Sequence, residues 1–90
     1  MPNRLVTLNG PDPIDRHVGQ RLRALRRAKG LSQSQLAALC ELSFQQIQKY
    51  EHGDNRISAS RLYRLALALD VSITALFEGL EATGTADGPG

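Results

Sequence analysis

The 90-residue chain has no tryptophan, a single cysteine and only four tyrosine or phenylalanine residues. Its core must therefore be built from aliphatic side chains. One cysteine cannot form a disulfide within the chain, which is typical of a reducing compartment. No apolar run approaches the roughly 20 residues of a membrane span, and the N-terminus lacks the apolar centre of a signal peptide. We therefore expect one small cytoplasmic domain that does not associate with membranes.

The sequence also offers little for catalysis. Its two imidazoles, His17 and His52, lie roughly 35 residues apart, and Cys40 lies on the apolar side of a predicted helix, where a buried structural thiol is expected. No metal-ligand spacing and no glycine-rich phosphate loop is present. These absences argue against an enzyme, and we expect no metal, cofactor or small-molecule ligand.

Basic residues are concentrated in the middle of the chain. From Arg16 to Arg64 there are ten basic and three acidic side chains, a formal charge of +7, whereas the remaining acids collect near the two ends. A basic centre suits a polyanionic partner, although a solvated charged surface explains the same pattern.

Helix-starting and helix-ending residues divide the chain into five predicted helices. The first begins after Asp12, with Pro13 at its first position, and stops at Lys29 before Gly30. Serines precede the other four, which we expect at residues 33–40, 44–52, 59–69 and 73–78. The expected fold class is all-α, a five-helix bundle over residues 12–80. Residues 1–11 are expected to form a flexible arm and residues 81–90 a disordered tail.

Apolar spacing within these helices predicts the core. The expected inward-facing residues are Ile14, Val18, Leu22 and Leu25 in the first helix, Leu36, Leu39 and Cys40 in the second, Ile47 in the third, and Leu62, Leu65, Ala66 and Leu69 in the fourth. Ser72 should cap the last helix, which is too short to bury all its apolar side chains. We assign Leu76 and Phe77 to the core, and Ile73 and Leu80 to the interface of a homodimer.

The segment from Leu31 to Gly53 predicts a helix-turn-helix, in which the second helix enters the DNA major groove. Two capping boxes define its helix starts: Ser32 with Gln35, and Ser43 with Gln46.

With Ile47 facing inward, a rotation of 100° per residue places Gln45, Lys49 and His52 on the opposite side of the second helix. Glutamine can pair with adenine and lysine with guanine, so this face suits double-stranded DNA. An ordinary polar helix face is the alternative.

Three stretches between Gly19 and Leu80 resemble the XRE family of phage repressor and Cro-like proteins: GQRLRALRRAKGLSQSQLA, SFQQIQKYEHG and RLYRLALALDVSITALF. The resemblance implies a five-helix domain that binds operator DNA as a dimer. It implies base contacts by Phe44, Gln45, Gln46 and Lys49, and phosphate contacts by Gln33, His52, Asn55 and Arg56. We add Arg61 as a phosphate contact, because it lies near the start of the fourth helix, where the DNA backbone would pass.

The resemblance also implies an ion pair between Arg26 and Glu51, and the helical rotation independently places Glu51 near the buried face, where a carboxylate needs a partner. Two positions depart from the family pattern. Glu41 occupies a turn position that is commonly glycine, so either the turn has another shape or a left-handed Glu41 costs about 1 kcal/mol. Phe44 replaces a residue that is often polar, and either contacts a thymine methyl or packs over the turn.

The expected function is a dimeric transcriptional regulator, a repressor, that reads duplex DNA. An antitoxin that binds both a toxin and its own promoter would share this domain. Residues 81–90 contain almost no apolar side chain with which to fold on such a toxin, which argues against that alternative.

Overall fold

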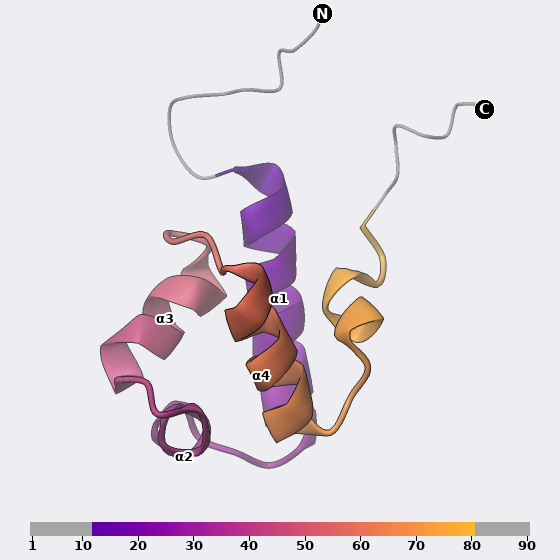
Figure 1. Ribbon diagram of the computed structural model, residues 1–90. Helices are drawn as coiled ribbons and strands as arrows, with labels where there is room; N and C mark the ends of the chain where they lie inside the picture. The colour runs from indigo at the N-terminus through magenta and orange to yellow at the C-terminus, as the bar shows by residue number, and fades with distance from the viewer. Residues whose placement is uncertain (1–11, 81–90) are drawn as a thin grey trace, which may run out of the picture.

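The computed structural model describes residues 12–80, which form helices and no strands (Figure 1). The elements are α1 (Pro13–Ala28), α2 (Gln33–Cys40), α3 (Phe44–His52), α4 (Ala59–Leu69) and the 3-10 helix η2 (Ile73–Phe77). The all-α prediction is confirmed for these residues, but the last helix is a 3-10 turn, so five α-helices are not confirmed. The arm and tail predicted for residues 1–11 and 81–90 lie outside the described residues. Within residues 12–80, no helix is both long and apolar enough to cross a bilayer.

Side-chain caps explain where α1 and α2 begin. Asp12 Oδ1 accepts a hydrogen bond of 2.7 Å from the Ile14 N–H, with Pro13 at the first helical position. Ser32 Oγ accepts from the Gln35 N–H at 3.0 Å, and Gln35 Oε1 accepts from the Ser32 N–H at 2.7 Å. The predicted capping box at α2 is therefore complete.

The later helix starts are capped less completely. Ser43 and Ser58 each accept from the N–H three residues on, at 3.0 and 3.2 Å. Ser72 was predicted to cap the last helix, and this is wrong: its hydroxyl makes no cap bond and lies 2.9 Å from the Thr74 hydroxyl instead. Since η2 is only one short 3-10 turn, the Ser72 side chain pairs locally rather than with the helix backbone.

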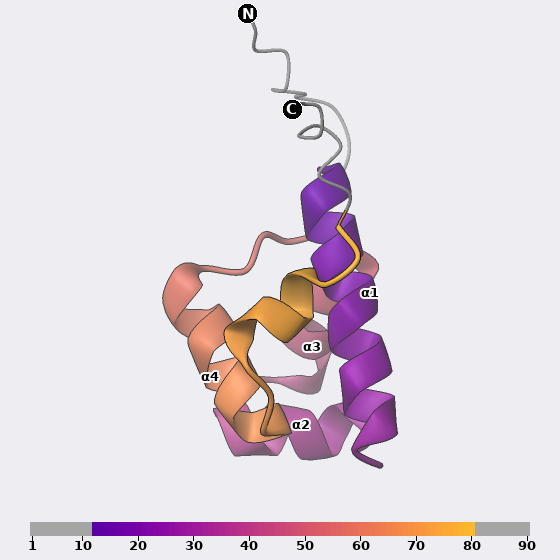
Figure 2. The ribbon, with the colours of Figure 1, turned by 90° about the vertical axis from the view of Figure 1, so that its right-hand side faces the viewer.

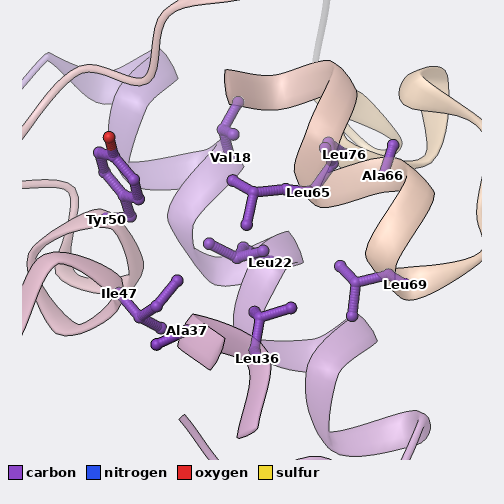
Figure 3. Packing of buried hydrophobic residues seen from close by; sticks show 10 residues of the cluster. All are labelled: Val18, Leu22, Leu36, Ala37, Ile47, Tyr50, Leu65, Ala66, Leu69 and Leu76. Atoms are coloured by element: carbon purple, nitrogen blue, oxygen red, sulfur yellow. The ribbon is translucent and has the colours of Figure 1, made fainter. Parts of the chain in front are cut away.

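All five elements contribute to one core (Figure 3). Its buried members are aliphatic apart from the ring of one tyrosine: Val18, Leu22, Leu36, Ala37, Ile47, Tyr50, Leu65, Ala66, Leu69 and Leu76. Leu25, Cys40 and Leu62 pack against this core while partly exposed. The composition thus predicted the chemistry of the core correctly.

Three predicted core residues are exposed instead. Leu39 is 60% exposed because α2 turns Leu36 and Ala37 inward, and Leu39 lies about 200° around the helix from Ala37. Ile14 is 51% and Phe77 is 36% exposed. Both line a solvent-open apolar cavity of about 170 Å³ bordered by α1, α4 and η2, where they reach the edge of the core but not its centre.

The main chains of α1 and α3 approach each other closely at two glycines. A Cβ atom at Gly19 would overlap the carbonyl oxygen of Tyr50 and lie 2.8 Å from that of Glu51. A Cβ at Gly53, just after α3, would lie 2.7 Å from the Cα of Arg16. Figures 1 and 2 show the resulting arrangement, with α3 beside α1 and α2 crossing the lower end of α1. These contacts set the direction of α3 relative to the rest of the domain.

Candidate nucleic-acid interface

The outward face of α3 carries amides, a lysine and a histidine, and no acid. Gln45, Lys49 and His52 are exposed, whereas Ile47 and Tyr50 are buried, as the helical rotation predicted. Gln46 and Gln48 lie at the edges, partly exposed. The only acid in α3, Glu51, is buried. This face can therefore approach an anionic surface without repulsion from an acid of α3 itself; the nearest exposed carboxylate is Asp54, just after the helix, whose Oδ2 lies 4.0 Å from His52 Nδ1.

Phe44 opens α3 with 39% of its surface exposed. It lies outside the buried core and is therefore accessible to a ligand. The structure leaves open both roles considered for it, a contact to a base and a cover over the turn.

The turn between α2 and α3 keeps the left-handed form that glycine favours. Glu41 has φ 58° and ψ 41°, its N–H donates to Ala38 O at 3.3 Å, and the Leu42 N–H donates to Ala37 O at 2.8 Å. Of the two possibilities considered for Glu41, the strained backbone is the one observed. Its cost is on the order of 1 kcal/mol. The 5→2 bond from Glu41 and the 6→1 bond from Leu42 close α2, and α3 starts three residues after Glu41, at Phe44.

Arg26 and Glu51 form a buried ion pair between α1 and α3. Arg26 Nε donates to Glu51 Oε2 at 2.6 Å and Arg26 Nη2 donates to Glu51 Oε1 at 3.1 Å, with side chains 10% and 1% exposed. Arg26 Nη1 donates to Leu31 O at 2.8 Å. The planar guanidinium thus joins α1, α3 and the segment that leads into α2.

Gln33, predicted to contact phosphate, is joined to this pair: its Nε2 donates to Glu51 Oε1 at 2.9 Å. One N–H of that amide group is therefore occupied. The second N–H and the backbone N–H groups of Gln33 and Ser34 remain for an anion, since the Gln35 N–H is bonded to Ser32.

A cavity of about 350 Å³ lies at this point. It is lined by Arg23, Arg26, Ser32, Gln33, Glu51 and His52. The structure thus brings two predicted phosphate contacts, Gln33 and His52, together. Arg23 was missed by the sequence reasoning. Its position three residues before Arg26 was the available signal, since residues at that spacing share a helix face.

The other predicted phosphate contacts lie away from this cavity and are partly engaged. Arg56 is 74% exposed, and its Nε donates to Asp15 Oδ2 at 3.3 Å. Its Nη2 lies 3.8 Å from Asp12 Oδ2. Arg61 Nη1 donates to the Tyr50 hydroxyl at 3.3 Å, and Asn55 is partly buried in the loop after α3. Of these three side chains, only Arg56 is largely exposed.

The predicted dimer residues lie at the opposite side of the domain. Ile73 is 37% exposed and Leu80 is partly buried. Polar contacts hold this segment to α1: Arg21 Nε donates to Ala75 O at 2.9 Å, and His17 Nε2 donates to Glu78 O at 2.8 Å. The segment therefore has a defined position while leaving part of its apolar surface exposed.

Cys40 is partly buried at the end of α2 and packs against the core. Burial raises the pKa of the Cys40 thiol, and the nearby charge of Arg61 only partly opposes this effect. The side chain is therefore a neutral thiol at pH 7, which suits packing rather than nucleophilic attack.

Comparison with known proteins identifies the fold. A helix-turn-helix family model, HTH_3, matches residues 22–76. An uncharacterized HTH-type transcriptional regulator of Sinorhizobium medicae (strain WSM419) is 46% identical over 80 residues, which is 89% of this chain and 58% of the relative. The chain thus spans somewhat more than half the length of that relative.

Solved structures of similar proteins have the same fold. The restriction-modification controller protein C.AhdI from Aeromonas hydrophila superposes with a TM-score of 0.68 and 43% identity, over 70% of this chain and 96% of that one. The biofilm master regulator SinR, solved in complex with DNA, has a TM-score of 0.62 and 30% identity, over 66% of this chain and 95% of its own.

Proposed function

Because the chain belongs to the HTH_3 helix-turn-helix family, as the XRE-like motifs predicted, we propose that it is a transcriptional regulator that binds specific duplex DNA sequences as a dimer. The observation that carries this proposal is the acid-free outer face of α3 beside the cavity at the start of α2. The names of its relatives and the DNA complex of SinR support the same function.

In this proposal α3 lies in the major groove and reads bases. Gln45 and Gln46 can each make paired hydrogen bonds to adenine, and Lys49 can reach the O6 and N7 acceptors of guanine. Phe44, accessible at the start of α3, is placed to contact a thymine methyl. These four side chains lie within two turns of one helix, which matches the few base pairs that one helix can read.

Phosphate contacts on both sides of α3 would hold it in the groove. On one side, the α2 N-terminus, Gln33 and His52 surround the cavity described above. On the other side, Asn55 and Arg56 extend from the loop after α3, and Arg61 lies near the start of α4. To bind a phosphate, Arg56 must break its ion pairs with Asp12 and Asp15. Exposed ion pairs contribute only about 0–1 kcal/mol, so this exchange is readily offset.

A single reading helix covers only a few base pairs, so we infer a two-fold dimer with half-sites about 34 Å apart. Ile73 and Leu80 offer apolar surface for that contact. Bound across a promoter, such a dimer excludes other proteins from it, which is how we expect it to repress. Sedimentation of Leu80→Asp at micromolar concentration should give a monomer. An unchanged dimer would place the interface on another surface.

The reading role of α3 is tested by comparing two substitutions on sequences selected from random duplexes. Lys49→Ala should cost roughly 1–3 kcal/mol on the preferred site and relax selectivity at one base pair. Arg56→Ala should weaken specific and non-specific binding alike. It should also make the log–log salt slope shallower by about 0.9 for each phosphate that the variant no longer neutralises. If both variants weakened all sequences by the same factor, α3 would not be the reading helix.

A further inference from the structure

The arginines of α1 differ in how they are partnered on its two sides. Arg21 contacts Ala75 O and Glu78 on the η2 side, and Arg26 is buried against Glu51. Arg16, Arg23 and Arg27 are exposed, and within residues 12–80 none of them is in an ion pair. We call these three residues the α1 arginine row.

The row occupies one face of the helix. At 100° per residue, Arg16, Arg23 and Arg27 lie within about 40° of one another, and Gln20 lies beside them on the same face. The one acid within α1, Asp15, lies about 100° away from Arg16. From Arg16 to Arg27 the helix rises about 16 Å. In Figure 2 the right-hand side of α1 is covered by no other helix.

Helix stability does not explain the whole row. A cation in the last turn, such as Arg27, is stabilised by the helix dipole. Arg16 lies at the other end, one residue after Asp15, where the positive end of the dipole disfavours a cation. The helix dipole therefore does not account for a cation at Arg16.

The row adjoins the proposed DNA-binding surface at both ends of the α1–α3 contact. Arg23 lines the cavity that also holds Gln33 and His52. The Cγ of Arg16 lies 2.7 Å from where a Cβ on Gly53 would be, so its side chain runs beside the end of α3. DNA seated on α3 would continue past both side chains.

We propose that the α1 arginine row binds the phosphodiester backbone of duplex DNA flanking the half-site read by α3. This inference rests on the proposed function and extends the contacted DNA beyond the bases that α3 reaches. One strand carries a phosphate for each 3.4 Å of helix axis, so a row of about 16 Å runs alongside about five phosphates. Guanidinium groups can bind phosphate oxygens with two parallel hydrogen bonds each.

The test compares a short duplex that ends at the selected motif with a long duplex that adds about ten base pairs on each side. The parent protein should bind the long duplex about tenfold more tightly, with a salt slope steeper by up to about 0.9 for each additional phosphate neutralised. The variant Arg16→Gln, Arg27→Gln, which leaves Arg23 in place in the proposed phosphate-binding cavity, should bind the short duplex within about twofold of the parent and should lose most of the gain in affinity when the flanks are added.

Arg64→Gln is the matched control. Arg64 is exposed on α4 and lines a different cavity, with Leu39 and Leu67, so this variant should keep the full gain in affinity from the flanks. Thermal unfolding of all variants checks that the fold is intact, which is expected because the changed side chains are exposed.

A double variant that keeps the gain in affinity from the flanks overturns the inference, and so does one that weakens short and long duplexes by the same factor. If the parent selects no motif at all, the proposed sequence-specific function fails instead. The arginine row is then still tested, because parent and variant can be compared on short and long duplexes of arbitrary sequence.

Discussion

The half of the domain formed by α1, α2 and α3 is held together differently from the half formed by α4 and η2. In the first half, main chains touch at Gly19, and a buried ion pair between Arg26 and Glu51 joins all three helices. In the second half, η2 has one fully buried side chain, Leu76, and is attached to α1 mainly by polar contacts. The half that carries α3, the proposed reading helix, is thus fixed by a main-chain contact and a buried ion pair.

The second half also leaves more apolar surface exposed. Tyr63 and Leu67 on α4 are 58% and 62% exposed, and Ile73 and Phe77 on η2 are 37% and 36% exposed. Such surface is what a dimer contact requires. The first half exposes Ile14, Leu39 and Phe44, so exposed apolar surface is not confined to one half. The difference teaches that the contacts that fix the helices and the surface available for the proposed dimer contact are separate properties.

Among the substitutions that test this comparison, Glu51→Leu should lower the free energy of unfolding most, because it leaves the Arg26 guanidinium buried without its carboxylate. We expect a decrease of about 3–5 kcal/mol in the free energy of unfolding, measured by urea denaturation. The double change Arg26→Met with Glu51→Leu should recover most of that stability, since it removes both charges. A Glu51→Leu variant as stable as the parent would show that the pair does not hold α1 and α3 together.

Gly19→Ala should give the second-largest loss of stability. The new methyl group would overlap the carbonyl oxygen of Tyr50 and must push α1 and α3 apart. We expect a destabilisation of about 1–3 kcal/mol, as for overpacked cores, together with weaker DNA binding because α3 changes direction. Gln20→Ala, on the exposed face next to it, should stay within about 0.5 kcal/mol of the parent. Equal melting temperatures for the two variants would contradict the main-chain contact.

Two serine substitutions compare the halves at their helix starts. Ser43→Ala removes the hydrogen bond to the Gln46 N–H and should cost about 1 kcal/mol. Ser72→Ala removes no cap bond and should change stability by less than about 0.5 kcal/mol. Thermal unfolding measures both changes. A Ser72→Ala cost equal to that of Ser43→Ala would mean that η2 is capped after all.

The smallest effect is expected from the two left-handed residues that are not glycine, Glu41 after α2 and Asp70 after α4. Glu41→Gly should stabilise the domain by about 0.5 kcal/mol, because relief of the strained backbone is partly offset by the greater flexibility of glycine in the unfolded chain. Asp70→Gly should gain less, because Asp tolerates this conformation better than Glu. Calorimetric melting that ranked them in the reverse order would contradict this.

Local chemistry made the ends of the α-helices predictable. Ser32, Ser43 and Ser58 bond backbone groups three residues away, and Gly30 and Gly53 adopt the left-handed conformation expected after a helix. These interactions span only a few residues, so a sequence pattern contains them in full. The predicted bounds of α2, α3 and α4 are confirmed for that reason.

The choice of which residues face inward was less predictable where helices are short. In the eight residues of α2, Leu36, Ala37 and Leu39 are compatible with more than one buried stripe, and only packing against α3 and α4 selects Ala37 over Leu39. In η2, the register that buries Leu76 leaves Phe77 at the edge. Periodicity needs several turns before it specifies one face.

The candidate site likewise has features that the sequence predicts and contacts that it does not. The exposed residues of α3 could be predicted once Ile47 was assigned to the core, because the rotation per residue within one helix fixes the direction of all the others. The bond from Gln33 to Glu51 and the pairing of Arg56 with Asp15 join residues that are distant in sequence. Such partners depend on the way helices pack, and no spacing rule in the chain contains them.

The close approach at Gly19 has a consequence for how such a protein changes over generations. Because α3 rests against α1 through backbone atoms, its direction depends little on the side chains it carries outward. If Gln45, Gln46 and Lys49 read bases, as we propose, each can be replaced without moving the helix that presents it. A change in the preferred DNA sequence would then require substitutions only on this outward face, whereas a substitution at Gly19 or in the Arg26–Glu51 pair would move α3 itself.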